Sequence, residues 1–307
     1  MRTFIIVLVI IVVVVGGGYF LVNNFSNKIE VVNNPPLNTE TASSTVSENN
    51  ASTTEVLINK AETVIGQSAQ GNDIVAYHYG QGETELLFIG GIHGGYEWNT
   101  VLVASQLMDY LKRNPSVVPA NLKVTVIPVL NPDGLAKVVG TTTRDFSSRD
   151  VSASKETQVA GRFNANKVDL NRNFDCDWKS VGTWQSQSVS GGSAVFSEPE
   201  SQAIRSYVAA NKPAAVIAWY SAAGGVYASS CHNGVSTETK TLTQKYADAS
   251  GYPAYQSFDF YATTGDMLNW LAKENIPAIS VLLTNHTDTE WTKNQAGVEA
   301  MLKYYAK

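Results

Sequence analysis

Apolar side chains recur at strand-like and helix-like intervals over most of the chain. Asn72–Tyr79 alternates between apolar and polar residues, as a half-buried strand does, and Thr84–Gly90 is a second strand-like run. Leu102–Lys112 instead repeats its apolar residues at the 3.6-residue spacing of a helix face. Leu122–Leu130 is β-branched and nearly continuously apolar, which is typical of a strand covered on both sides. The order strand, helix, strand predicts a right-handed crossover and a largely parallel sheet.

The second half of the chain resumes this alternation after a long polar segment. We read Asn131–Gly134 as a turn, and the segment 141–193 that follows it as a functional or a disordered region. The further elements that we predict are a helix at Glu198–Ala210 capped by Ser197 or a neighbour, a strand at Ala214–Trp219, helices at Thr237–Ser250 and Asp266–Lys273, a strand at Ala278–Leu283 and a helix at Glu290–Tyr305. The expected fold class is α/β, with a mixed, largely parallel sheet and helices on both faces.

The first 56 residues differ from the rest in composition. Phe4–Val22 contains no charge and is mostly Ile and Val, so we predict that residues 1–22 form a single-pass membrane anchor rather than a cleaved signal peptide. Residues 23–56 are rich in Ser, Thr and Asn, with few apolar side chains, which favours a disordered linker. The domain at 57–307 would then lie outside the cytoplasm, at the cell membrane.

Charge and cysteine content narrow the classes of function. The chain has 307 residues and a net charge of -5, with no basic cluster, which argues against binding to nucleic acid. Its two cysteines, Cys176 and Cys231, would be able to form a disulfide in an oxidising compartment. Two unpaired, buried thiols are the alternative.

Candidate metal chemistry follows the strand at Thr84–Gly90. His93 and Glu97 come directly after its glycines, and imidazole and carboxylate are ligand types of catalytic zinc sites. Arg162–Asp175, Tyr220 and His286 also follow predicted strands. Ligands in open α/β sheets bind outside the carboxyl ends of the strands, so all these residues would be able to line one crevice.

Five short segments occur in order along the domain: GGIHGGYEW at 90–98, NPDG at 131–134, VDLNRNFD at 168–175, FSEPES at 196–201 and YATTGDMLNW at 261–270. Together they make the chain from Leu57 to Lys307 resemble the zinc carboxypeptidase A family of metallopeptidases. The resemblance implies a carboxypeptidase-like α/β sandwich, one zinc ion and removal of C-terminal residues from peptides. It implies that His93 and Glu97 are metal ligands, with one residue more between them than the family pattern has.

The same resemblance implies roles in substrate binding and catalysis. Asn171 and Arg172 match the pair that binds the free C-terminal carboxylate of the substrate, and a guanidinium suits this by making two parallel charge-assisted bonds. Arg162 resembles an arginine that stabilises the oxyanion of the tetrahedral intermediate; a salt bridge within its own loop is the alternative. Tyr261 matches a mobile tyrosine that closes over the substrate. Leu268 falls where the family sets its preference for the terminal side chain, which would favour an apolar one.

Two positions depart from the family pattern. Tyr220 stands where the third zinc ligand, a His, is expected, and Leu282 stands where the general base, a Glu, is expected. A neutral phenol is a poor zinc ligand, and leucine cannot accept a proton. His286 and His232 are candidate substitutes for the missing ligand.

We therefore expect a zinc metallocarboxypeptidase-type protein whose activity is in doubt. Its substrates would be the C-termini of peptides or of peptidoglycan stem peptides outside the cytoplasm. A catalytically inactive relative that binds peptide C-termini is the main alternative. An acyl-amino-acid hydrolase with a related zinc site is a further one, although the Asn–Arg pair favours peptides.

Overall fold

The computed structural model describes residues 61–307. The predicted anchor at 1–22 and linker at 23–56 lie outside the described residues. Within 61–307, no helix is both long and apolar enough to cross a membrane.

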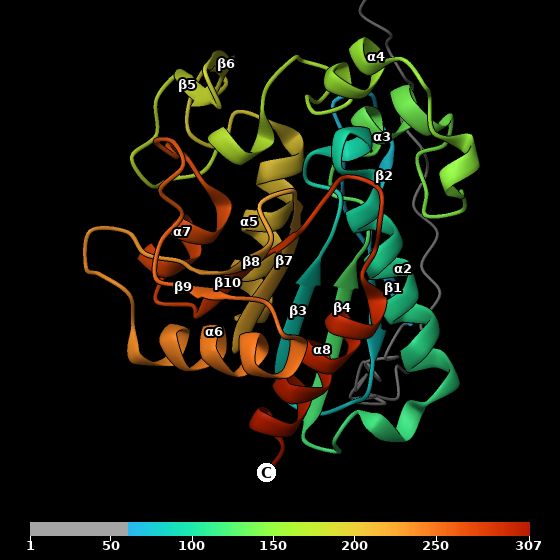
Figure 1. Ribbon diagram of the computed structural model, residues 1–307, viewed down its shortest axis with the longest axis vertical. Coiled ribbons are helices and arrows are strands. Elements are labelled where there is room, and N and C mark those ends of the chain that lie inside the picture. The colour runs from blue at the N-terminus through green and yellow to red at the C-terminus, as the bar shows by residue number, and fades with distance from the viewer. Residues whose placement is uncertain (1–60) are drawn as a thin grey trace, which may run out of the picture. The chain divides into compact units, whose positions relative to one another are not determined.

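An eight-stranded mixed sheet forms the centre of the described domain (Figure 1). Its four central strands run parallel to one another, and its outer strands add antiparallel pairs at both sides. In spatial order the strands are β1 (Glu62–Gln67), β2 (Asp73–Tyr79), β4 (Leu122–Ile127), β3 (Thr84–Ile89), β7 (Ala215–Ser221), β10 (Ala278–Leu283), β8 (Gly225–Ala228) and β9 (Ala254–Tyr255). The predicted mixed, largely parallel sheet is confirmed.

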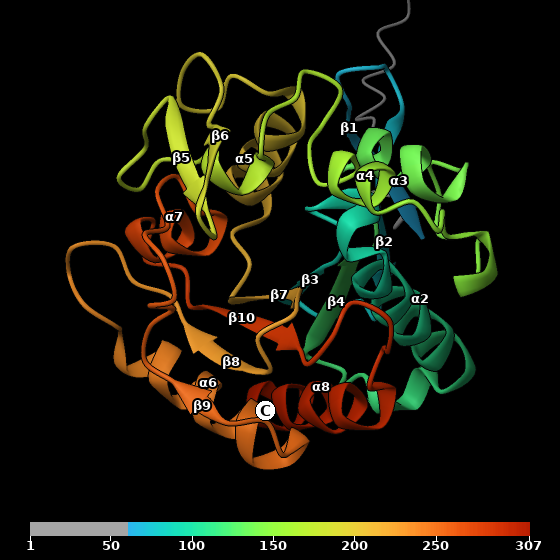
Figure 2. The same cartoon turned by 45° about the horizontal axis from the view of Figure 1, so that its top comes forward.

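Helices cover both faces of this sheet, as predicted (Figure 2). One face packs against α2 (Trp98–Arg113), α6 (Thr237–Ser250) and α8 (Trp291–Tyr305), and the other against α5 (Pro199–Asn211) and α7 (Met267–Lys273). Successive residues of a strand point to opposite faces, so Leu86 and Phe88 join the first core while Leu87 and Ile89 join the second. Burial on both faces explains why the central strands are almost continuously apolar.

The segment between β4 and β7 is more regular than the sequence pattern indicates. Asn131–Gly134 is not an isolated turn: it is the N-cap and first turn of α3 (Pro132–Val139), and the Asn131 side chain accepts a hydrogen bond from the Gly134 N–H. The polar segment contains α4 (Lys155–Ala160) and a hairpin formed by β5 (Val181–Trp184) and β6 (Gln187–Ser190). Four short 3₁₀ turns complete the elements: η1 (Gly94–Glu97), η2 (Pro115–Val117), η3 (Ser148–Asp150) and η4 (Leu170–Arg172).

A disulfide joins the polar segment to the sheet. It connects Cys176, which follows η4, to Cys231, which follows β8. The loop that it closes spans 55 residues and includes α5 and β7. The polar segment is therefore tied covalently to the chain just after β8, whose end lies beside the start of β10.

Candidate functional site

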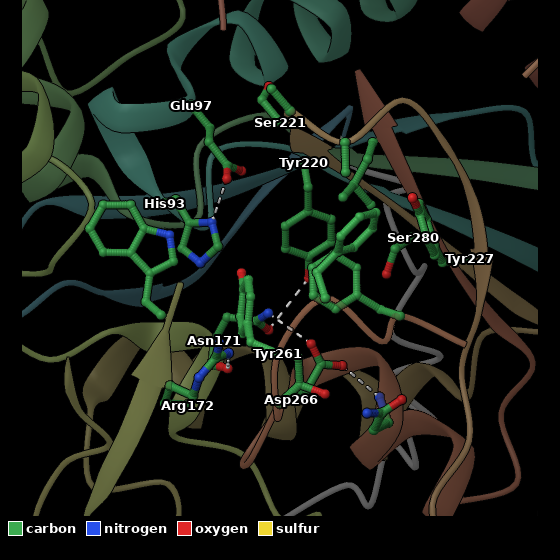
Figure 3. Close-up of a pocket in the computed structure, with 18 of the residues that line it drawn as sticks. His93, Glu97, Asn171, Arg172, Tyr220, Ser221, Tyr227, Tyr261, Asp266 and Ser280 are labelled. Atoms are coloured by element: carbon green, nitrogen blue, oxygen red, sulfur yellow. Dashed lines mark hydrogen bonds and ion pairs between the residues drawn. The ribbon is translucent and has the colours of Figure 1, made fainter. Parts of the chain in front are cut away.

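A pocket of about 840 Å³ lies beyond the carboxyl ends of β3, β7 and β10 (Figure 3). Most of the site residues inferred from the sequence line it: His93, Glu97, Arg162, Asn171, Arg172, Tyr220, Tyr261, Leu282 and His286. We call the part around His93, Glu97, Tyr220 and Leu282 the metal side, and the part around Asn171, Arg172 and Asp266 the clamp side. Residues that lie far apart in the sequence are thus brought to one pocket.

On the metal side, η1 turns His93 and Glu97 toward each other. The Nδ1 atom of His93 lies 2.9 Å from Oε1 of Glu97, and both side chains are almost fully buried. The turn needs glycine, because Gly94 has a φ of +46° and a Cβ there would lie 2.7 Å from the Gly161 carbonyl oxygen. The longer spacing between the two residues therefore does not separate their side chains.

The Asp169 carboxylate contacts the other ring nitrogen of His93. Its Oδ1 lies 3.4 Å from Nε2 of His93, and its Oδ2 accepts hydrogen bonds from Arg162 at 2.8 and 2.9 Å. Burial alone would raise the pKa of Asp169, but the charge of Arg162 together with His93 and Arg172 outweighs burial and holds this pKa well below its ordinary value. A carboxylate of this kind orients a metal-binding His in many proteins. Arg162 thus forms the loop salt bridge that was the alternative to an oxyanion role, while it still lines the pocket.

Several buried polar atoms of the metal side have no aligned hydrogen-bond partner. They are both ring nitrogens of His93, Oε2 of Glu97 and Nδ1 of His286. Buried polar atoms are normally satisfied, so these atoms indicate a place for a ligand or an ion. The question is whether enough donors surround that place to hold zinc.

The third zinc ligand, a His in the family pattern, is absent from its expected position. Tyr220 is the residue before the end of β7. Its ring lies 5.7 Å from the His93 ring, and its hydroxyl lies 3.5 Å from Oδ1 of Asn171. Burial raises the pKa of Tyr220 well above its ordinary value, so the phenol is neutral and a poor ligand. Leu282 lies directly beside Tyr220 on β10 and supplies neither an acid nor a base.

Neither His286 nor His232 supplies the missing third zinc ligand. His286 packs against the Tyr96 ring at 4.7 Å, and burial lowers its pKa, which keeps the imidazole neutral. His232 is exposed, contacts Asp177 at 3.3 Å and does not line the pocket. Across residues 61–307, the one trio of His, Cys, Asp or Glu with ligand atoms within 4.8 Å of one another is His232 with the two disulfide cysteines. His93 and Glu97 are thus one protein ligand short of a catalytic zinc site, and the residues as placed do not fit that metal.

On the clamp side, Arg172 is buried without a carboxylate partner among the described residues. Only 1% of its surface is exposed. Its Nε and Nη2 both donate to the Thr183 carbonyl, at 3.1 and 2.8 Å, and its Nη1 donates to the Asn171 carbonyl at 2.6 Å. A guanidinium has five N–H groups, so two remain for a ligand. Tyr261 lies beside it, with 5.8 Å between its ring centre and the Arg172 Cζ.

Asn171 connects Arg172 to a carboxylate that the sequence analysis did not single out. Its Nδ2 donates to Oδ2 of Asp266 at 2.8 Å, and its Oδ1 accepts from the Met267 N–H at 3.0 Å. Asp266 is the N-cap of α7 and lines the pocket. Leu268, two residues later, is buried in the core cluster that also contains residues of α5, and it does not line the pocket, so the structure gives it no contact with a terminal side chain.

Three residues that line the pocket or contact its lining were not identified from the sequence, for two different reasons. Asp169 and Asp266 lie inside the segments that carry the family resemblance, where they would have been found by asking what holds each candidate. Trp184, whose ring lies 4.4 Å from the Arg162 Cζ, stands alone in a polar segment. No local pattern marks it.

Known proteins share this fold. The structure is similar to that of the murein-tripeptide amidase MpaA of Escherichia coli O157, with a TM-score of 0.57 and 21% identity over 81% of this chain and 94% of that one. It is also similar to bovine thrombin-activatable fibrinolysis inhibitor, with a TM-score of 0.60 and 17% identity over 79% and 87% of the two chains. Carboxypeptidase A of Helicoverpa armigera gives a TM-score of 0.56 and 19% identity over 79% and 66%.

The sequence itself carries the assignment to a family. The profile of the zinc carboxypeptidases matches residues 59–302, which is most of the chain and includes every residue of the pocket described above. The family is zinc-dependent, and its fold is that of metallopeptidases. This chain therefore belongs to the zinc carboxypeptidase family.

Proposed function

We propose that this protein binds the free C-terminal end of a peptide in its pocket and does not hydrolyse it. The observation that carries the proposal is the buried guanidinium of Arg172, whose known partners are all neutral carbonyl oxygens. A buried charge is stable when it is paired, so this one favours an anionic ligand. A carboxylate fits the two free N–H groups of the guanidinium.

The surroundings of Arg172 favour a peptide terminus over a small free anion. The pocket is large enough for an amino-acid residue and continues past Tyr261 toward the metal side. The Oε2 atom of Glu97, which has no hydrogen-bond partner, would face the backbone of the residues before the terminus, where peptide N–H groups need acceptors. Clamp and backbone contacts together would select a chain end.

Hydrolysis is the second candidate function. It is favoured by the family and by the side chains of His93 and Glu97, which supply ligand types that zinc takes. Against it stand Tyr220 and Leu282, since general-base assistance alone contributes ~10²–10⁴ in rate. Zinc content of the purified protein and turnover of blocked dipeptides separate the two: we expect sub-stoichiometric zinc and no turnover, whereas one zinc per chain with chelator-sensitive turnover would establish the hydrolase.

The binding proposal is tested by calorimetry with one peptide in two forms, a free acid and a C-terminal amide. We expect the free acid to bind at least ~30-fold more tightly, because the amide cannot neutralise the buried guanidinium. Arg172→Met should abolish this difference. The matched control is Arg205→Met, which removes an exposed arginine of α5 that packs on Phe196. Equal affinity for acid and amide in the unaltered protein would contradict the proposal.

We further propose that the domain works outside the cytoplasm, anchored through residues 1–22 and carried on the linker at 23–56. The disulfide between Cys176 and Cys231 supports this, because such bonds persist in oxidising compartments. Peptidoglycan stem peptides are then one ligand class to include, as MpaA is named for a murein tripeptide. Protease added to intact cells should remove the domain; protection of the domain until lysis would argue against this location.

A further inference from the structure

The disulfide lies next to two further metal-ligating side chains. Asp177 follows Cys176 in the sequence, and His232 follows Cys231. A ring nitrogen of His232 and the two sulfur atoms all lie within 4.8 Å of one another. Asp177 contacts the same imidazole, with 3.3 Å between its Oδ1 and Nε2 of His232, and its Oδ2 lies 3.9 Å from the Cys176 sulfur. We call these four residues the disulfide cluster.

The backbone brings the side chain after each cysteine to the sulfur atoms. Asp177 has a φ of +51° and His232 a φ of +59°, in the left-handed region that residues other than glycine seldom adopt. In an extended chain, adjacent side chains point to opposite sides, so a cysteine and the residue after it would lie apart. A left-handed residue is costly and persists where the surrounding structure holds it. The same local device therefore occurs at both ends of the disulfide.

The disulfide cluster is open to solvent on one side. The side chains of His232 and Asp177 are 66% and 58% exposed, whereas both cysteines are buried. An ion therefore reaches the sulfur atoms past an imidazole and a carboxylate. A contact between an exposed His and an exposed Asp contributes little to stability, so it does not account for two strained backbone positions. The cluster contains none of the residues of the metal side.

We propose that Cys176, Cys231 and His232 bind a thiophilic divalent cation such as Zn²⁺ when the disulfide is reduced. The thiolate, and not the sulfur of a disulfide, is the metal ligand. A dithiol reductant breaks the S–S bond by giving two electrons and two protons to the sulfurs, and it becomes a disulfide itself. The cation then displaces the two thiol protons.

The spacing of the three donors suits such an ion. Zinc binds thiolate at ~2.3 Å and imidazole at ~2.0–2.1 Å, so the ligand atoms of a tetrahedral site lie roughly 3.3–3.8 Å apart. The 4.8 Å limit on the present distances leaves only small shifts to be made once the S–S bond opens. Asp177 is a positioning residue, because a carboxylate that contacts a metal-binding His orients its ring.

The chain thus has two ways to close the same loop. The loop spans 55 residues, and a covalent bond closes it in oxidising surroundings. A bound cation closes it in reducing surroundings. In both forms Cys176 stays next to the pocket, since its carbonyl accepts from the Gly265 N–H at 2.7 Å and Asp177 lines the pocket.

Titration of the full chain with Co²⁺ tests the proposal, because a cobalt–thiolate bond gives a sulfur-to-metal absorption that His93 and Glu97 cannot give. A water-soluble phosphine is the reductant: it takes the oxygen of one water molecule, leaves two thiols and contains no thiol of its own. We expect the absorption to saturate at about one Co²⁺ per chain after reduction and to be absent before it. A reduced chain without this absorption would overturn the proposal.

Variants of the two exposed residues test the ligand set. His232→Ala should weaken Co²⁺ binding at least ~100-fold and Asp177→Asn ~10-fold, because loss of a ligand costs more than loss of the group that orients it. Asp248→Asn, an exposed change on α6, is the control and should leave the affinity unchanged. Equal affinity of His232→Ala and the unaltered protein would overturn the assignment of the imidazole.

The unfolded chain provides the second control, since the thiols of any reduced chain bind metal to some extent. In urea the reduced chain should bind Co²⁺ ~100-fold more weakly than the folded one, because the ion must then close the loop itself. Equal affinity with and without urea would overturn the proposal, because the fold would then contribute nothing to the site.

Discussion

The two sides of the pocket have kept different amounts of what a carboxypeptidase needs. On the metal side, His93 and Glu97 face each other as ligands would, but a neutral phenol and a leucine stand where the remaining chemistry belongs. On the clamp side, hydrogen bonds to neighbouring groups fix the side chains of Arg172 and Asn171, and two N–H groups of Arg172 remain free. The difference teaches that the residues of the clamp and those of the metal site can be preserved to different extents within one pocket.

The two buried arginines show the same contrast in electrostatic terms. Arg162, on the metal side, has a fully buried carboxylate of its own in Asp169. Arg172, on the clamp side, has carbonyl oxygens only. One guanidinium therefore has its counter-ion within the protein, and the other is the one that a ligand carboxylate completes in our proposal.

The largest effect is expected from separating Arg162 from its partner. Asp169→Asn leaves the buried Arg162 with only a long contact of 3.9 Å to the Glu97 carboxylate, which should lower the free energy of unfolding by ~3–5 kcal/mol in urea denaturation. Asp175→Asn is the control, since Asp175 pairs with Lys273 at the surface and should cost less than ~1 kcal/mol. Similar losses in the two variants would contradict the contrast between the arginines.

The pH dependence of stability provides a second measurement on Asp169. Its folded pKa lies below its unfolded value of ~3.9, so its stabilising contribution is fully present above pH ~4 and is lost as the pH falls through the folded pKa. Asp169→Asn should therefore flatten the decline of stability in acid. An unchanged decline below pH 4 would mean that other carboxylates dominate it.

The next effect concerns the metal side. Tyr220→His combined with Leu282→Glu supplies a third nitrogen donor and a carboxylate at the positions where the family pattern has them. Zinc affinity should rise at least ~100-fold, measured by competition with a chelator, and turnover of blocked dipeptides should become detectable. Tyr220→Phe with Leu282→Glu adds no nitrogen ligand and is the control; equal zinc binding by both double variants would show that Tyr220 is not the missing ligand position.

The smallest effect is expected from Tyr261, whose ring lies beside Arg172 on the clamp side. Tyr261→Leu removes an aromatic ring 5.8 Å from the Arg172 Cζ and should weaken binding of free-acid peptides ~5-fold, about 1 kcal/mol. Tyr304→Leu, which removes a comparable ring–cation contact with Lys245 on another part of the domain, should leave peptide affinity unchanged. A large loss in Tyr304→Leu would indicate general destabilisation instead.

Periodicity predicted the fold well where elements are long. The helix at Thr237–Ser250 and the strand at Ala278–Leu283 have the predicted bounds. Asn131–Gly134 was read wrongly, because Asn, Pro and Gly suit both a turn and a helix start. The decision lies further along the chain, where Leu135 and Val138 pack into a separate apolar cluster and hold α3 together.

The candidate site was predictable only as far as contiguous segments reveal it. The segments located His93, Glu97 and Arg172, which line the pocket. They did not show that Asp169 neutralises Arg162 or that Asn171 donates to Asp266, because these facts depend on contacts across the fold. Leu268 was assigned by position alone, and the turn of α7 directs it into the core.

Two adjacent residues of the hairpin of β5 and β6 contact the two buried arginines, Arg172 and Arg162. The Thr183 carbonyl receives two N–H groups of Arg172, and the Trp184 ring lies over Arg162. Gly182 and Trp184 are buried while Val181 and Thr183 are exposed, so a slip of one residue in the pairing would turn the indole to solvent and move the carbonyl away. Inserting or deleting a single amino acid in this hairpin would therefore remove the contacts of Arg172 and of Arg162 together, and so would alter both sides of the pocket.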